Sequence, residues 1–243
     1  MPRYTRTYKT INRLVGKAIC QYDMIKDGDR IAVGLSGGKD SLALLWTLAE
    51  RKKRIQVHYD LVPIYVDPGF PGGFGTDLAE TCREMGLDLM MDHGNHGPLA
   101  HSSENRENPC FLCARHRRQR LFQIAESLGI CTLALGHTKD DIIETLFLNI
   151  CYAGEISTMV PRQDFFGGRF TVIRPLAMVD EDCIRQFARQ RHFPDFLNPC
   201  PSSGKTKRSE IRQMLVALYA SNSKIKGNIY RAMSHVKLEY LLK

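Results

Sequence analysis

Six consecutive residues have the composition of an anion-binding loop: Ser36, Gly37, Gly38, Lys39, Asp40 and Ser41. Paired glycines let backbone amides approach a phosphate, and the helix expected after them favours negative charge at its start. Lys39 adds a positive charge, whereas Asp40 is suited either to hold Mg²⁺ between phosphates or to cap the helix. The spacing differs from the common GxxxxGK[ST] loop. It predicts a phosphate site of another kind, and an ordinary tight turn is the alternative.

A second group consists of cysteines, of which the chain has eight. Cys110 and Cys113 form a CxxC motif at the start of a predicted helix, where the helix dipole and nearby arginines favour thiolates. Cys200 in a later loop is the third candidate ligand. Zinc, a redox pair, an iron–sulfur cluster and an accidental pairing all remain open. Cys131 and Cys151 adjoin apolar segments, so we expect both in the core.

A third group follows the fourth predicted strand and contains His137, Asp140 and Asp141. We expect one carboxylate to hold Mg²⁺ or to assist proton transfer, while the other caps the next helix. The nearby helix carries Arg115, Arg117, Arg118 and Arg120, which either meet phosphate or form a solvated face.

The elements that position these residues alternate between strand and helix. Strands are expected at 30–35, 56–66, 87–91, 131–135 and 170–173, with a long loop at 92–109. Helices are expected at 5–22, 41–51, 76–85, 111–128, 141–150, 181–190, 209–220 and 223–243. The alternation predicts an α/β fold with a doubly wound parallel sheet and basic N- and C-terminal helices. Ligands bind such sheets at the carboxyl ends of the strands, where all three groups fall.

We expect a basic N-terminal helix over 1–26, a catalytic ATP-binding domain over 27–178, and a helical region over 179–243 that contributes Cys200. Hydrophobic residues make up 43% of the chain and charged residues 25%, as in soluble globular proteins. Neither a membrane span nor a secretory signal is evident, so we expect a cytoplasmic protein. The formal net charge of +8 favours polyanions such as nucleic acids, although many basic proteins bind none.

Several motifs, in order, resemble those of a known family. The loop at 36–41 resembles the SGGxDS motif of the PP-loop ATP pyrophosphatases. Residues 110–118 resemble the CxxCxRxRR segment of the tRNA 2-thiocytidine synthetase family within that group, and residues 136–146 resemble its GHxxDDxxET segment. The chain is identified as a member of that family over about residues 10–220. One departure is that a serine stands within 199–204 where the family has a second cysteine.

The resemblance implies a function that the residues alone leave open. ATP is expected at Ser36, Gly37, Gly38, Lys39, Asp40, Ser41, Val66 and Gly136, with Mg²⁺. The implied catalytic residues are Lys39, Asp40, His137, Asp140 and Asp141. Cys110, Cys113 and Cys200 are expected to hold a [4Fe-4S] cluster whose fourth iron holds incoming sulfide. The implied reaction adenylylates the 2-oxygen of a pyrimidine, expected to be cytidine, in the anticodon region of tRNA and replaces it with sulfur.

The expected partners are tRNA and a sulfur donor, either a cysteine desulfurase or free sulfide; a homodimer is left open, and no membrane partner is expected. Two alternatives remain. One is an adenylylating ligase of the lysidine-forming kind, with its cysteines on structural zinc. The other is a non-catalytic module that senses ATP or a cluster and binds nucleic acid.

Overall fold

The computed structural model describes residues 4–106, 108–197, 199–202 and 206–242. The chain divides into two compact units, each described by itself. The first contains residues 1–138 and 160–203, and the second contains residues 139–159 and 204–243. Within the described residues, no helix is both long and apolar enough to span a membrane. The domain boundaries expected from the sequence stay a prediction.

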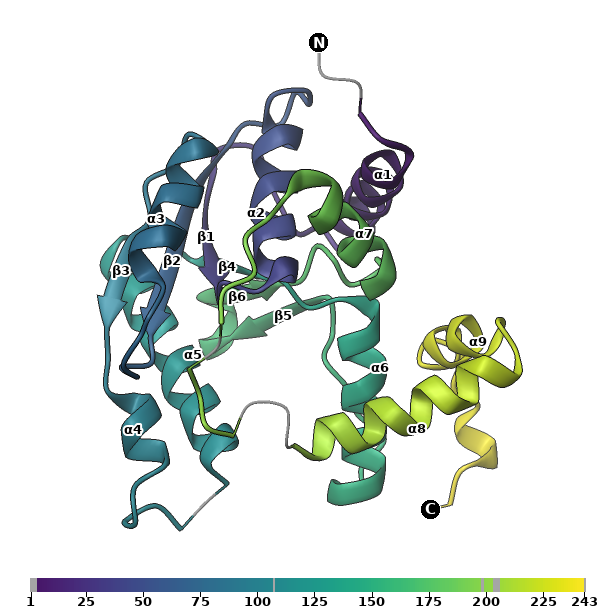
Figure 1. Cartoon of the computed structure of the whole chain (residues 1–243). Helices are drawn as coiled ribbons and strands as arrows, with labels where there is room; N and C mark the ends of the chain where they lie inside the picture. The colour runs from purple at the N-terminus through teal and green to yellow at the C-terminus, as the bar shows by residue number, and fades with distance from the viewer. Residues whose placement is uncertain (1–3, 107, 198, 203–205, 243) are drawn as a thin grey trace. The chain divides into compact units, whose positions relative to one another are not determined.

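The first unit is built around a six-stranded sheet in the order β3-β2-β1-β4-β6-β5 (Figure 1). Its strands are β1 (Asp29–Leu35), β2 (Tyr59–Asp67), β3 (Met90–His93), β4 (Thr132–Leu135), β5 (Arg162–Phe165) and β6 (Phe170–Ile173). All neighbours pair in parallel except β5 and β6, which form an antiparallel pair. Parallel strands need crossover connections, which here are mostly helices. The predicted α/β fold with a mainly parallel sheet is confirmed.

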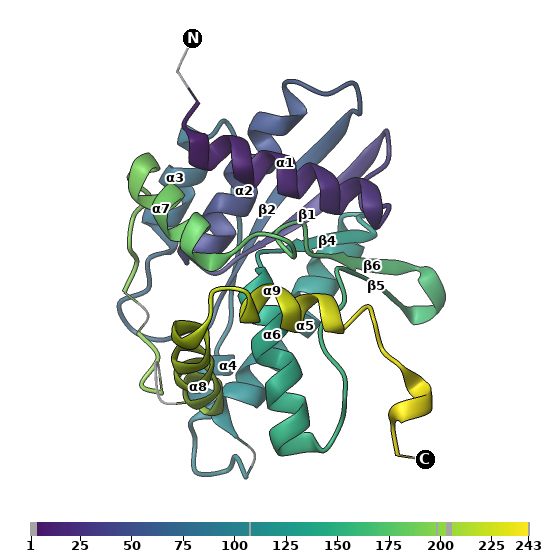
Figure 2. The same cartoon turned by 90° about the vertical axis from the view of Figure 1, so that its right-hand side faces the viewer.

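One face of the sheet packs against the larger apolar core. Four helices contribute to that core: α1 (Arg6–Gln21), α2 (Lys39–Lys52), α3 (Gly75–Glu84) and α7 (Glu181–Arg191). The side chains of β1 alternate, so Ile31 and Val33 join this core while Ala32 points to the other one. Figure 2 shows α1 lying alongside α2 and α7, two helices that it contacts. Burial of one face of α1 explains its amphipathic sequence pattern.

The opposite face of the sheet is covered by α5 (Pro109–Ser127). Leu121, Ile124 and Ala125 of this helix pack on apolar side chains of β2, β4 and β6. The same helix begins with the CxxC motif. A buried anchor in its C-terminal half therefore fixes the position of the two cysteines at its start.

The second unit is helical and has its own small core. It contains α6 (Lys139–Leu148), a π-helical turn η1 (Asn149–Ala153), α8 (Lys207–Ser221) and α9 (Ile225–Ala232). Ile143 of α6 packs against Ile211 and Leu215 of α8. Glu144 is buried beside them and is bonded by two arginines of α8, Arg208 and Arg212.

Four sequence expectations are corrected. The stretch 92–109 is not structureless, because α4 (His96–Ala100) lies within it. Strand β5 was not predicted, since its sequence, RQDF, has too few apolar residues to signal a strand. The tail is not one helix: α9 ends at Ala232, and a short 3-10 turn (Leu238–Tyr240) follows. Cys131 and Cys151 are exposed rather than in the core.

Candidate active site

The phosphate loop, residues 36–41, connects β1 to the first turn of α2. Its hydroxyl groups organise the loop itself: Ser41 Oγ donates to the Gly38 carbonyl at 2.8 Å and accepts from the Ser36 amide at 3.3 Å. The Gly38 amide donates to Ser36 Oγ at 3.4 Å. Gly38 is the N-cap of α2, without a side-chain cap, so Asp40 lies inside the first turn and does not cap the helix. The helix N-terminus thus faces the loop, as an anion site requires.

Two glycines allow the close approaches that this site needs. Gly37 has φ +76°, a conformation that favours glycine, and a Cβ there would lie 2.3 Å from the ring of Phe74. A Cβ on Gly136 would lie 3.0 Å from backbone atoms of Asp40 and Ser41. Gly136 therefore lets the chain leaving β4 pass against the first turn of α2. The predicted site residues at 36–41 and 136 are neighbours in space.

The ammonium group of Lys39 has two carboxylate partners. Its Nζ lies 2.7 Å from Glu181 Oε1 and 3.1 Å from Asp40 Oδ2. Burial opposes the charge, but the hydrogen bond to Glu181 and the charges of both acids outweigh it and raise the pKa of Lys39. Sequence reasoning did not select Glu181, because an acid in the first turn of a helix is also the ordinary complement of the helix dipole.

His137 receives a hydrogen bond from a buried arginine. Arg174 Nε donates to His137 Nδ1 at 3.2 Å, and its Nη1 donates to the Val160 carbonyl at 2.6 Å. Burial, aided by the charge of Arg118, lowers the pKa of Arg174 to about 10. Since Arg174 can only donate, a neutral His137 carries its proton on Nε2. In that state Nε2 is a hydrogen-bond donor.

The other predicted contacts are placed differently. Val66 in β2 is 1% exposed and packs in the core, so its backbone is what it can offer to a ligand. Asp140 and Asp141 lie in the first turn of α6, in the second unit. There Asp140 pairs with Lys226 of α9 at 2.5 Å, and Asp141 pairs with Arg208 of α8 at 3.5 Å.

The structure brings the three candidate cysteines to one place in the first unit. Cys110 Sγ and Cys200 Sγ each lie 3.4 Å from Ser202 Oγ. Cys113 is one helical turn after Cys110 and feels the charge of both other thiols. All three side chains are half-buried. Two of the thiols thus share the Ser202 hydroxyl as a neighbour, and the third lies close enough to influence them electrostatically. Thiolates are the usual protein ligands of iron–sulfur clusters.

No three Cys, His, Asp or Glu side chains of the described residues are arranged to hold a single metal ion.

Local structure holds this group in place. Asn108 caps α5, and its Oδ1 accepts from the amides of Cys110 and Phe111. His101 Nε2 lies 2.8 Å from Ser202 Oγ and 3.9 Å from Cys200 Sγ, while its Nδ1 donates to the Gly97 carbonyl at 2.9 Å. The sequence did not indicate a role for His101 or Ser202. His101 lies in a polar stretch without a motif, and nothing distinguishes Ser202 from the serine that follows it.

Burial raises the pKa of the Cys113 thiol, and the neighbouring Arg117 opposes that rise. Arg117 therefore favours the thiolate form that a metal ligand must take. Arg120, in contrast, is held by Asp92 through two hydrogen bonds of 2.7 and 2.8 Å. Arg120 of α5 thus forms a structural ion pair, whereas Arg117 of the same helix lies close enough to Cys113 to affect the pKa of its thiol.

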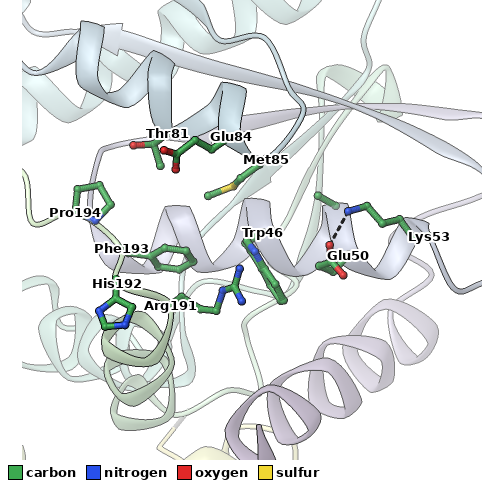
Figure 3. A pocket seen from close by; sticks show the side chains of 11 residues that line it. Trp46, Glu50, Lys53, Thr81, Glu84, Met85, Arg191, His192, Phe193 and Pro194 are labelled. Carbon is green, nitrogen blue, oxygen red and sulfur yellow. Dashed lines mark hydrogen bonds and ion pairs between the residues drawn. The ribbon is translucent and has the colours of Figure 1, made fainter. Parts of the chain in front are cut away.

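A cavity of about 240 Å³ lies apart from these groups (Figure 3). It is lined by the C-terminal part of α2, the end of α3 and residues 191–194, which begin with the last residue of α7. Arg191 covers the Trp46 ring at 4.4 Å, and Lys53 pairs with Glu50 at 2.6 Å. None of the site residues predicted from the sequence lines it.

Comparison with known proteins identifies the class to which this fold and phosphate loop belong. A family model described as a PP-loop domain matches residues 4–218, and the chain belongs to this family. The NH3-dependent NAD synthetase of Campylobacter jejuni shares the fold, with a TM-score of 0.53 at 14% identity over 97% of this chain and 99% of that one.

More specific relatives follow within that class. The tRNA-cytidine(32) 2-sulfurtransferases of Geobacter sulfurreducens and Geotalea daltonii are 38% and 39% identical to this chain. The matches cover 97% of this chain and 93% and 94% of those proteins. The structure of the U34-tRNA thiolase NcsA from Methanococcus maripaludis, with its [4Fe-4S] cluster, matches with a TM-score of 0.79 and 27% identity. That match covers 97% of this chain and 80% of NcsA. The predicted membership of the tRNA 2-thiocytidine synthetase family is confirmed.

Proposed function

We propose that this chain is an ATP-dependent, iron–sulfur tRNA sulfurtransferase that converts a cytidine of the anticodon loop, position 32, to 2-thiocytidine. The observation that carries the proposal is the convergence of Cys110, Cys113 and Cys200 in the unit that holds the phosphate loop. The substrates named for the relatives, cytidine 32 and the uridine of NcsA, are both tRNA pyrimidines. The higher identity to the cytidine enzymes favours cytidine. Its proposed setting is the cytoplasm.

In the proposed reaction, the phosphate loop and the N-terminus of α2 bind the phosphates of ATP. Lys39 exchanges a carboxylate partner for phosphate, and Asp40 supplies an oxygen for Mg²⁺. For Asp140 and Asp141 the proposal stays as the sequence predicts it: one of the two carboxylates binds Mg²⁺ or assists proton transfer. The adenine lies along the backbone near Val66 and beside Gly136. The 2-oxygen of the base attacks the α-phosphorus and pyrophosphate leaves, so the oxygen becomes part of a good leaving group. Sulfur then adds at C2, and AMP departs with the original oxygen.

His137 is suited to the developing negative charge. Because Arg174 occupies Nδ1, the neutral ring can donate from Nε2 to a phosphate oxygen or to the 2-oxygen. Cys110, Cys113 and Cys200 would hold the [4Fe-4S] cluster, which when bound supplies an open iron position for the incoming sulfide. The proposed sulfur donor is a cysteine desulfurase or free sulfide, and a homodimer is compatible with this scheme.

The test is the iron, zinc and acid-labile sulfide content of anaerobically purified protein. We expect about four irons and four sulfides per chain. Cys200→Ser should lose most of both, whereas Cys20→Ser, which changes an exposed cysteine of α1, should retain them. Zinc without sulfide would contradict the proposal and favour the lysidine-forming alternative.

A second assay follows AMP and 2-thiocytidine formation from ATP and undermodified tRNA. One AMP per thiolated base is expected. ATP binding without AMP release from any tRNA would contradict an enzymatic role and favour the sensing module.

A further inference from the structure

The segment that carries Cys200 has little regular structure to hold it. Helix α7 ends at Arg191, and the described residues of the cysteine arm, 192–202, form no helix or strand. Figure 1 shows the chain running from α7 toward the start of α5 as an extended trace. The position of the Cys200 thiol therefore depends on contacts between the arm and the rest of the unit, such as those with His101.

One side chain of the arm reaches the phosphate loop. The ring of Phe196 stacks on that of Phe74, with centroids 4.8 Å apart and planes 11° from parallel. A Cβ built on Gly37 would lie 2.3 Å from the Phe74 ring and 3.3 Å from Phe196 Cδ2. Gly37, Phe74 and Phe196 are thus in direct van der Waals contact. Phe74 also packs on Tyr65 of β2, with the ring centroids 5.3 Å apart.

The residues directly beside Phe196 are more exposed, and Phe193, the other phenylalanine of the arm, packs on Phe187 of α7. Pro194, Asp195 and Leu197 are exposed, and Leu197 is 89% exposed, whereas Phe196 is half-buried and packs on the larger core. Phe196 precedes Cys200 by four residues. Phe196 therefore links the phosphate loop to the segment that carries this cysteine.

We propose that Phe196 is a positioning residue that couples nucleotide binding at the phosphate loop to the order of the cysteine arm. The proposal rests on the proposed function, in which the loop binds ATP and Cys200 is a cluster ligand. Packed rings transmit small displacements because a close-packed interior cannot absorb them. When ATP fixes the loop around Gly37, the Phe74 ring is fixed with it, and so is the arm. By reciprocity, an ordered arm favours ATP binding by the same factor.

The experiment measures how fast N-ethylmaleimide alkylates Cys200 in metal-free protein, with and without ATP and Mg²⁺, by peptide mass spectrometry. Exposed Cys131 is the internal standard. We expect ATP to slow alkylation of Cys200 by about fivefold or more. Phe196→Ala should abolish this protection, Leu197→Ala should preserve it, and Phe196→Tyr should restore it. Phe196→Leu keeps an apolar side chain without the ring and replaces Phe196→Ala if that variant fails to fold.

Equal ATP protection in Phe196→Ala and Leu197→Ala would overturn the proposal, because ATP would then shield Cys200 directly. Bound ATP, measured by equilibrium dialysis, without any protection in the native chain would overturn it too, and would leave the proposed function standing. Absence of ATP binding would sink both. A purely structural role for Phe196 would raise reactivity equally with and without ATP, and this also contradicts the proposal.

Discussion

At the scale of single residues, Asp40 is the acid whose placement is informative. It lies in the first turn of α2, where a negative charge suits the dipole, yet it faces Lys39 in a loop built for anions. The proposed function reconciles these observations, because a carboxylate at this position would be an oxygen ligand for the divalent cation that accompanies ATP.

Asp40→Asn keeps the shape of the side chain and removes its charge. We expect AMP formation from ATP and tRNA to fall by at least about 100-fold, because a metal clamp contributes several kcal/mol at the transition state. Asp88→Asn changes an exposed acid outside the site and is the matched control. Unchanged AMP formation in Asp40→Asn would contradict the proposal that Asp40 binds the metal ion.

A second prediction concerns the thiol of Cys82. This cysteine of α3 is buried, and burial raises its pKa to about 11. A raised pKa keeps the thiol protonated at every pH well below that value, and the thiolate is the reactive form. At pH 8 in the folded protein, iodoacetamide should therefore label Cys20, Cys131 and Cys151 long before Cys82. Mass spectrometry of the labelled peptides checks the order, and early labelling of Cys82 would mean that α3 opens readily.

At the scale of elements, the start of α5 depends on its cap. Asn108→Ala removes the acceptor for the amides of Cys110 and Phe111. A lost cap costs about 1 kcal/mol, which corresponds to a fall in Tm of about 2–4 °C for a chain of this size. Asn108→Asp should retain stability, because aspartate caps equally well. The amount of iron that the protein retains should also fall in Asn108→Ala, because the cap positions the cysteines. If the cluster of this variant resists a chelator as long as that of the native protein, the cysteines do not depend on the cap.

The elements also show what a sequence can predict. Apolar runs and glycine turns gave β1, α2 and β4 with their order, because those patterns reflect burial in a parallel sheet. Strand β5 was not predicted, because it is a short edge strand that pairs antiparallel with the next strand, β6, and its sequence is mostly polar. The motif residues at 36–41 and 110–113 were found from type and spacing. Roles for Glu181, His101 and Phe196 could not be predicted in this way, since each of these residues contacts a residue that is distant in sequence.

At the scale of the whole molecule, the charge of +8 bears on tRNA binding. Each phosphate neutralised by a basic side chain releases counterions, so affinity falls as salt rises. A fourfold increase in salt should weaken tRNA binding about tenfold for every two phosphates contacted. Binding measured by filter retention across a salt series gives the slope directly. A slope near zero would show that the basic surplus serves no polyanion.

The strand order has a consequence for how the chain is made. Strand β1 pairs with β2 on one side and with β4 on the other. The β4 partner of Ile31 is Thr132, which is synthesised much later. At ordinary rates of translation, roughly 5–20 s separate the synthesis of these strands. During that interval the nascent chain contains β1, an apolar strand, with the backbone hydrogen-bonding groups of one edge still unpaired. We therefore expect chaperones that act on nascent chains at the ribosome to bind this chain. Slowed elongation between residues 35 and 132 should increase the aggregation of the nascent chain.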